Sequence, residues 1–172
     1  MDSYTFVLNF TLPRGNENPE ALVDALYEAG CDDATVGIGL HGMIGLDFTR
    51  SAATADEALR SAIQDVTRAI PGAALVHAGP DLVGLTDMAG LFGFSRQNMR
   101  KYATGSGPGK AAFPPPAYLG EPSLWRLAEI VAWLKRNTNV QPRDDIFEVS
   151  KAAAKINFET EQRRVGRILA LT

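Results

Sequence analysis

Six polar side chains with a capacity to recognise nucleic acid lie close together in the middle of this sequence. They are Ser95, Arg96, Gln97, Asn98, Arg100 and Lys101. An arginine side chain can bind the major-groove edge of guanine, and an amide side chain can bind that of adenine. A serine hydroxyl and the free backbone amides at the start of a helix can hold phosphate. If this segment is helical, its residue types predict a contact with double-stranded DNA.

The residues around this segment predict two short helices joined by a sharp turn. We expect Thr86 to cap the first helix and Gly93 to supply the positive φ of the corner. We expect Ser95 to cap the second helix, and Met99 and Tyr102 to turn that helix towards the core. This arrangement is typical of a helix-turn-helix. The alternative is a solvated helix on an ordinary helical hairpin.

Three motifs that follow one another from 81 to 136 resemble the winged helix-turn-helix of the MerR and phage-excisionase superfamily. They are an L-T-x-x-A-x-x-x-G-x-S-R-Q opening, an F-P-x-P stretch and an L-W-R…I-x-x-W-L close, and they cover about a third of the chain. The resemblance implies a wing before Trp125, with Phe113 and Trp125 on paired strands and Trp133 packing a third helix on the core. It also implies, by position, that Lys110 and Arg126 contact the DNA backbone. The long segment from 103 to 112 departs from the family's pattern.

The distribution of charge agrees with this interpretation. Up to Pro80 the chain carries eleven acidic and four basic side chains, a net charge of −7, whereas the remainder carries +4. The segment from Ser95 to Arg136 contains seven basic side chains and only two acidic ones. A local positive field of this size attracts a polyanion and makes its binding dependent on salt. We expect the acidic first part to face away from the nucleic acid.

The first part of the chain predicts a small α+β unit. Strands are expected over 4–12, 34–40, 43–49 and 73–78, since apolar residues there alternate or cluster. Helices are expected after the caps Asn18 and Thr54, and a tight reversal at His41-Gly42. The order strand, helix, strand, strand, helix, strand is that of a ferredoxin-like sandwich. Such a unit can sense a small molecule or bind a protein, so the fold alone does not decide its role.

The last part of the chain predicts a linker followed by a helix. Residues 137–142 are expected to form the linker, and Asp144 or Asp145 to cap the helix. One apolar stripe runs through Ile146, Val149, Ala153 and Ile156, and a second follows with a shift in phase. The second stripe comprises Phe158, Val165, Ile168 and Leu169. The apolar stripe of this helix can be buried against the first domain or against a second copy of the chain. We expect a homodimer.

Catalytic chemistry has little support in the sequence. His41 and His77 have no metal-ligand spacing with each other or with Cys31. The glycines from Gly37 to Gly42 match G-x-G-x-x-G, but a strand pattern follows where a dinucleotide site needs a helix. The glycines from 105 to 109 do not have the spacing of a phosphate loop. We therefore expect no enzyme activity, no metal and no cofactor.

Composition places the chain among ordinary globular proteins. It has 172 residues, 45% of them hydrophobic, and a single cysteine, and it contains no apolar run long enough to cross a membrane. The first residues lack the pattern of a secretion signal, so we expect a cytoplasmic protein. We expect a ferredoxin-like sensor or interaction domain over 1–80, a winged helix-turn-helix over 81–137, and a linker with a C-terminal helix over 138–172.

Three functions remain open on this evidence. The first is a sequence-specific transcriptional regulator that reads the major groove with the helix starting at Ser95. The second is an excisionase-like bending factor, or an antitoxin-type regulator that binds a partner protein. The third, from another class, is a protein–protein adaptor that does not bind DNA. Salt-dependent affinity for duplex DNA separates the third from the others.

Overall fold

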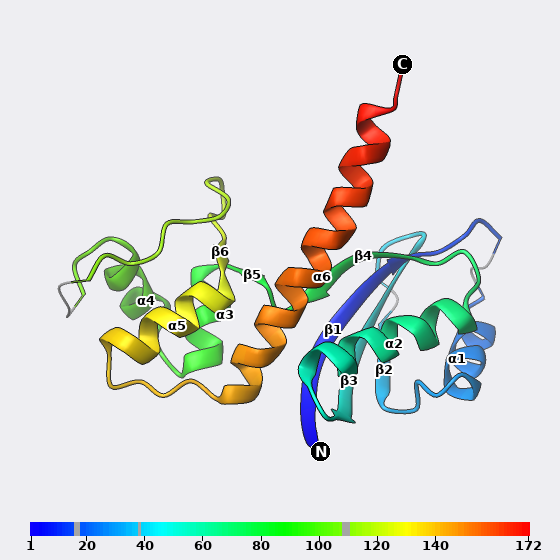
Figure 1. Cartoon of the computed structure of the whole chain (residues 1–172), viewed down its shortest axis with the longest axis horizontal. Helices are drawn as coiled ribbons and strands as arrows, with labels where there is room; N and C mark the ends of the chain where they lie inside the picture. Colours follow the sequence, from blue (N-terminus) through cyan, green and yellow to red (C-terminus); the bar gives the residue numbers. More distant parts are fainter. Residues whose placement is uncertain (16–17, 38, 108–110) are drawn as a thin grey trace.

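The computed structural model describes residues 1–15, 18–37, 39–107 and 111–172, and it is a mixed α+β structure (Figure 1). Within these residues two hydrophobic clusters form, one around a four-stranded sheet and one among short helices. We call the parts built on them the sheet unit (residues 1–79) and the helical unit (residues 82–137). A long final helix lies between the two units in Figure 1 and extends beyond both.

The sheet unit consists of four antiparallel strands and two helices. The strands are β1 (Asp2–Thr11), β2 (Ala34–Gly37), β3 (Met43–Ala52) and β4 (Ala74–Gly79), in the order β2-β3-β1-β4. β1 pairs with β3 along its whole length and with β4 on its other side. Helices α1 (Pro19–Glu28) and α2 (Ala55–Ala69) connect the strands as the sequence predicts.

Alternation along the strands explains how this sheet obtains its core. Tyr4, Phe6, Leu8 and Phe10 of β1 are buried, whereas Thr5 between them is exposed. The apolar stripes of α1 and α2 belong to the same hydrophobic cluster as these side chains. Their caps are the predicted ones, since Asn18 accepts a hydrogen bond from the amide of Glu20, and Thr54 accepts one from the amide of Glu57. The expected second strand is shorter than predicted and ends at Gly37; Ile38 lies outside the described residues.

The helical unit contains two short paired strands and three helices. They are β5 (Leu82–Val83), α3 (Leu85–Phe92), α4 (Arg96–Ala103), β6 (Trp125–Arg126) and α5 (Leu127–Asn137). Met88, Met99, Leu127, Ile130 and Leu134 are among the buried side chains of its core. Trp125 and Trp133 are also buried there, as expected.

Two details of the helical unit correct the predictions. Thr86 does not cap α3: the helix begins after Gly84, whose amide donates a hydrogen bond of 2.9 Å to a carboxylate oxygen of Asp87. Asp87, in the first turn, thus accepts the hydrogen bond from the Gly84 amide. The helix begins at Leu85, which is earlier than a cap at Thr86 would allow. Phe113 is not on a strand paired with Trp125; instead Trp125 pairs with Val83.

The final helix, α6 (Asp144–Leu169), divides into two parts with different surroundings. Its first half packs against α2, β1 and β4, where Val149, Ala153 and Ile156 are buried in the core of the sheet unit. Residues 161–172 are all exposed, and this end projects from the molecule in Figure 1. Neither Asp144 nor Asp145 caps the helix, because it already begins after Arg143 and each aspartate pairs with a basic side chain.

Candidate nucleic-acid interface

The start of α4 is formed by a turn that the local sequence specifies. Gly93 ends α3 with φ of 69°, a conformation that a side chain would oppose. Ser95 then caps α4, since its hydroxyl accepts a hydrogen bond of 3.1 Å from the amide of Asn98. Met99 and Tyr102 are buried and anchor α4 to the core. The opposite side of α4 therefore faces solvent in a fixed orientation.

Aromatic contacts hold the segment after α4 against the same core. The indole of Trp133 donates a hydrogen bond of 2.8 Å to the carbonyl of Ala112, and that of Trp125 donates one of 3.1 Å to the carbonyl of Pro114. Phe113 lies between the two tryptophans, with its ring centroid 5.0 Å from that of Trp133. Two buried indoles thus satisfy their N–H groups on the backbone of this segment, which fixes its path beside α4.

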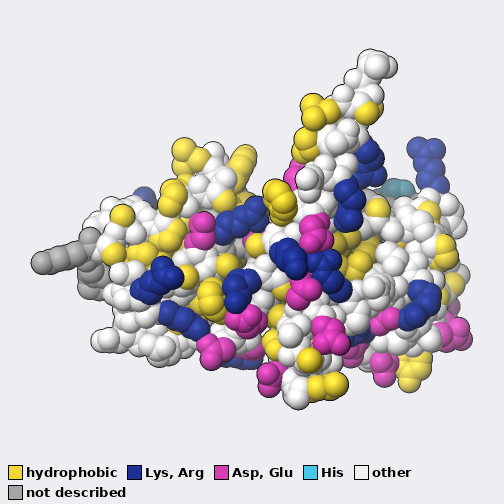
Figure 2. Space-filling view, viewed as in Figure 1, with side chains coloured by type: hydrophobic (Ala, Val, Ile, Leu, Met, Phe, Trp, Pro, Cys, Tyr) yellow, Lys and Arg dark blue, Asp and Glu magenta, His cyan; other side chains and the backbone are white. Residues whose placement is uncertain are grey.

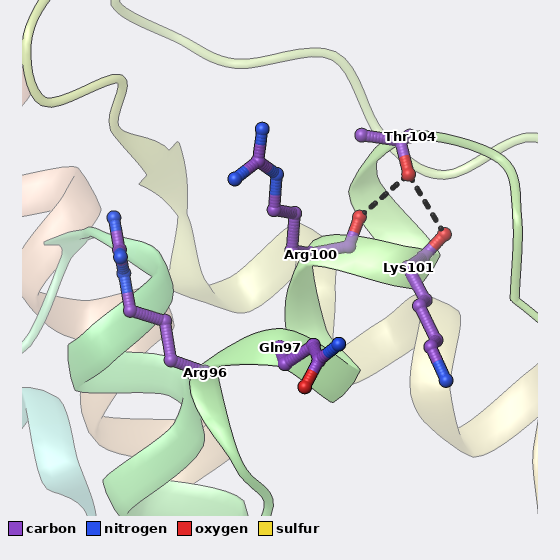
Figure 3. Close-up of a pocket in the computed structure, with 5 residues that line it drawn as sticks. All are labelled: Arg96, Gln97, Arg100, Lys101 and Thr104. Carbon is purple, nitrogen blue, oxygen red and sulfur yellow. Dashed lines mark hydrogen bonds between the residues drawn. The ribbon is translucent and has the colours of Figure 1, made fainter.

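The polar side chains predicted to contact DNA gather on the outer side of α4. Arg96, Gln97, Arg100, Lys101 and Thr104 line one open groove (Figure 3). The side chains of Arg96 and Arg100 extend to the same side in that view, whereas Lys101 extends to the other. Ser95 is exposed as well, but Asn98 is half-buried.

The basic side chains of α4 differ from most others in having no ion-pair partner among the described residues. Most basic side chains elsewhere in the described chain are engaged by carboxylates. Arg96, Arg100 and Lys101 are exposed and take part in none of the ion pairs within those residues. Exposed cations whose charge is not neutralised by an ion pair form a surface that favours an anionic ligand.

A second cleft continues from Arg96 and Arg100 towards a small hairpin. This hairpin is closed by two backbone hydrogen bonds between Tyr118 and Leu124. The cleft is lined by the following residues of α3, α4, β6 and the hairpin: Gly84, Leu85, Thr86, Asp87, Arg96, Arg100, Glu121, Pro122, Ser123 and Trp125. The hairpin therefore lies next to the exposed side of α4.

The two backbone-contact residues implied by the resemblance do not join the α4 group. Lys110 lies outside the described residues. Arg126 is engaged elsewhere, because its guanidinium pairs with the carboxylate of Asp81. The same carboxylate oxygen accepts a hydrogen bond of 2.8 Å from Asn157 of α6. Arg126 therefore links the helical unit to the connection between the units and to α6.

Sequence reasoning did not anticipate the role of Asp81. Its side chain is 1% exposed, and its second carboxylate oxygen is buried without a hydrogen-bond partner among the described residues. The Asn157 side chain also bonds both backbone polar groups of Ala78, at 2.7 and 2.8 Å. These partners are distant in sequence, so no local pattern could have signalled the cluster.

Another cluster that the sequence did not signal surrounds Arg50 in the sheet unit. Its guanidinium, buried beside Phe48, pairs with Asp33 at 2.7 Å and with Asp65 at 2.8 Å. It also donates a hydrogen bond to the carbonyl of Gly30. Asp33 thus has a structural partner, and the cluster ties β3 to α2 and to the loop after α1.

The described residues contain no group of three or more histidine, cysteine or acidic side chains placed to hold a metal ion. Cys31 is a buried free cysteine. Burial is the main cause, and the negative charge of Asp65 the second, that raises the pKa of its thiol to about 11. Few thiolates form near neutral pH, which opposes nucleophilic chemistry at this residue. No helix within the described part of the chain is long and apolar enough to cross a membrane.

Comparisons with known proteins add no assignment. No protein-family model, curated protein or solved structure matches this chain.

Proposed function

We propose that this protein is a sequence-specific DNA-binding regulator of transcription that inserts α4 into the major groove. The observation that carries the proposal is the row of exposed, unpaired cations on α4, within the described residues, beside an exposed serine cap. In this proposal α3, α4, the hairpin from 118 to 124 and α5 act as a winged helix-turn-helix. Such a regulator would act in the cytoplasm.

Each α4 side chain has a distinct role in this proposal. Arg96 and Arg100 share two adjoining clefts and extend to one side, so they contact base edges or phosphates on the same side of the helix (Figure 3). Gln97 lies between Arg100 and Lys101 around the helix and reads a further base edge, and Lys101 contacts a phosphate on the other side. Ser95 and the first amides of α4 hold a further phosphate. Half-buried Asn98 supports the helix start and contacts DNA less than its neighbours do.

The sheet unit would supply the second activity of a regulator. Its strand order of β2-β3-β1-β4, with two helices contributing to one core, supports the ferredoxin-like sandwich expected from the sequence. We propose that it senses a small molecule or binds a protein. Its net charge of −7 up to Pro80 keeps this unit away from the phosphate backbone.

The proposal is tested by removing one guanidinium at a time. The variants Arg96→Ala and Arg100→Ala should each weaken binding to a genomic fragment selected by the wild-type protein by about 1–3 kcal/mol. Arg14→Ala is the matched control, because it removes an exposed arginine from the sheet unit and should leave the affinity unchanged. Fluorescence anisotropy measures the three affinities. Wild-type affinity in both α4 variants would exclude the proposed role of this helix.

A further inference from the structure

The projecting end of α6, residues 158–172, carries apolar side chains that the described chain leaves uncovered. Phe158 is 66% exposed and Leu169 is 80% exposed, and Val165 and Ile168 are exposed as well. Figure 2 shows hydrophobic side chains along this end of the molecule, where the helix stands clear of the two units. These residues form the second stripe that the sequence revealed.

Helix geometry explains why the sheet unit cannot cover this stripe. Each residue of an α-helix advances by about 100° around the axis. On that basis Phe158, Val165 and Leu169 lie on one side, and the buried Val149 and Ile156 lie on roughly the opposite side. A straight helix that buries the second group against the sheet must turn the first group away from it. The described residues therefore leave this side of α6 open to a second molecule.

The projecting end of α6 is the continuation of a helix whose first half is packed against the sheet unit. Most helical stability in proteins comes from the packing of an apolar face rather than from intrinsic propensity. Every residue from 161 to 172 is exposed, so this end receives no such packing from the described part of its own chain. Apolar residues confined to one side are the pattern of a helix that packs against a partner.

The order of charges along this end indicates which partner fits. The stripe is centred on Val165, and Glu161 and Arg164 both come before it in the sequence. At about 100° per residue, these two side chains lie on the same flank of the apolar stripe. Among the described residues, neither Glu161 nor Arg164 has an ion-pair partner. When two such helices run antiparallel, the acidic end of one meets the basic end of the other.

We propose that the projecting end of α6 pairs antiparallel with the same segment of a second copy. The spacing 158, 162, 165, 169 reads the same in both directions, so Phe158 of one copy can face Leu169 of the other. In this register Gln162 faces Val165 near the two-fold axis. Glu161 of each copy then lies within reach of Arg164 of the other, which gives two equivalent ion pairs. This pairing goes beyond the proposed DNA contact and does not rest on it.

The test uses charge reversal in the full-length chain without DNA. Sedimentation equilibrium should give a dimer for the wild-type protein. Glu161→Arg and Arg164→Glu should each weaken dimerisation by about tenfold, because each change converts two attractive pairs into two repulsive ones. The double variant Glu161→Arg/Arg164→Glu should restore dimerisation. Arg167→Glu is the matched control, since it makes the same charge change on the opposite side of the helix from Val165 and should have little effect.

Independent outcomes identify how the inference could fail. A wild-type monomer at all concentrations tested would overturn it, and so would a dimer that none of the reversals affects. Loss of dimerisation in the double variant as well would exclude the antiparallel register. A Val165→Asn variant must also weaken dimerisation, because it removes the apolar contact without changing charge. DNA binding by Arg96→Ala and Arg100→Ala tests the proposed function separately, so a failure of one proposal is distinguishable from a failure of the other.

Discussion

The contact between Asp81 and Arg126 predicts a large and specific effect on stability. Asp81 is 1% exposed, whereas the Arg126 side chain is 37% exposed. The change Arg126→Ala leaves the buried carboxylate with Asn157 as its remaining side-chain donor among the described residues. Removing one partner of a buried ion pair costs about 3–5 kcal/mol. We expect about 3 kcal/mol here, since water can reach the space that the partly exposed guanidinium vacates.

Thermal and urea unfolding measure this effect. For a chain of this length, about 3 kcal/mol corresponds to a decrease in Tm of roughly 6–12 °C. The double variant Asp81→Asn/Arg126→Ala should recover more than half of the loss, because no buried charge then remains unpaired. Arg136→Ala, which removes an exposed arginine from the last turn of α5, is the control and should change stability by less than about 0.5 kcal/mol. Wild-type stability in Arg126→Ala, or no recovery in the double variant, would refute this reasoning.

Three further predictions follow from single side chains or glycines. Gly93→Ala should destabilise the protein by about 1–2 kcal/mol in urea unfolding, since φ at this position is 69° and a Cβ opposes that conformation; an unchanged midpoint would contradict this. Burial lowers the pKa of His77, so the unfolded chain binds a proton more readily and stability should fall as pH decreases below about 6.5. The variant His77→Gln should remove that part of the pH dependence, and identical profiles for the two proteins would exclude it. Because burial raises the pKa of Cys31 to about 11, the native thiol should react with a thiol reagent at pH 8 far more slowly than the urea-unfolded chain, and equal rates would show that it is accessible.

Local patterns predicted the start of α4 well because its determinants are adjacent in sequence. Ser95 and Gly93 act through hydrogen bonds and φ angles that involve only a few neighbouring residues. The same reasoning failed at Thr86, because the acceptor for the first free amide of α3 is Asp87 inside the helix. A cap can be provided from either side of a helix start, and sequence spacing did not separate the two cases here.

Long-range contacts explain the features that the sequence did not predict. Asp81 of the connection between the units, Arg126 of β6 and Asn157 of α6 come together in the fold, and Arg50 meets Asp33 and Asp65 across the sheet unit. In the sequence alone, each of these polar residues looks like an ordinary solvent-exposed residue. Apolar periodicity was more informative in α6, because the change in phase marks where the buried part ends and the exposed part begins.

The salt dependence of duplex binding tests the central claim most directly, because it needs no knowledge of the recognised sequence. Affinity for a random-sequence duplex of about 30 base pairs should fall steeply and linearly on a log–log plot against salt concentration. The double variant Arg96→Ala/Arg100→Ala should reduce the slope by about 1 for each phosphate contact that it removes. Wild-type binding that is absent at low salt, or a slope that the double variant leaves unchanged, would contradict the account of α4 as a DNA-binding helix.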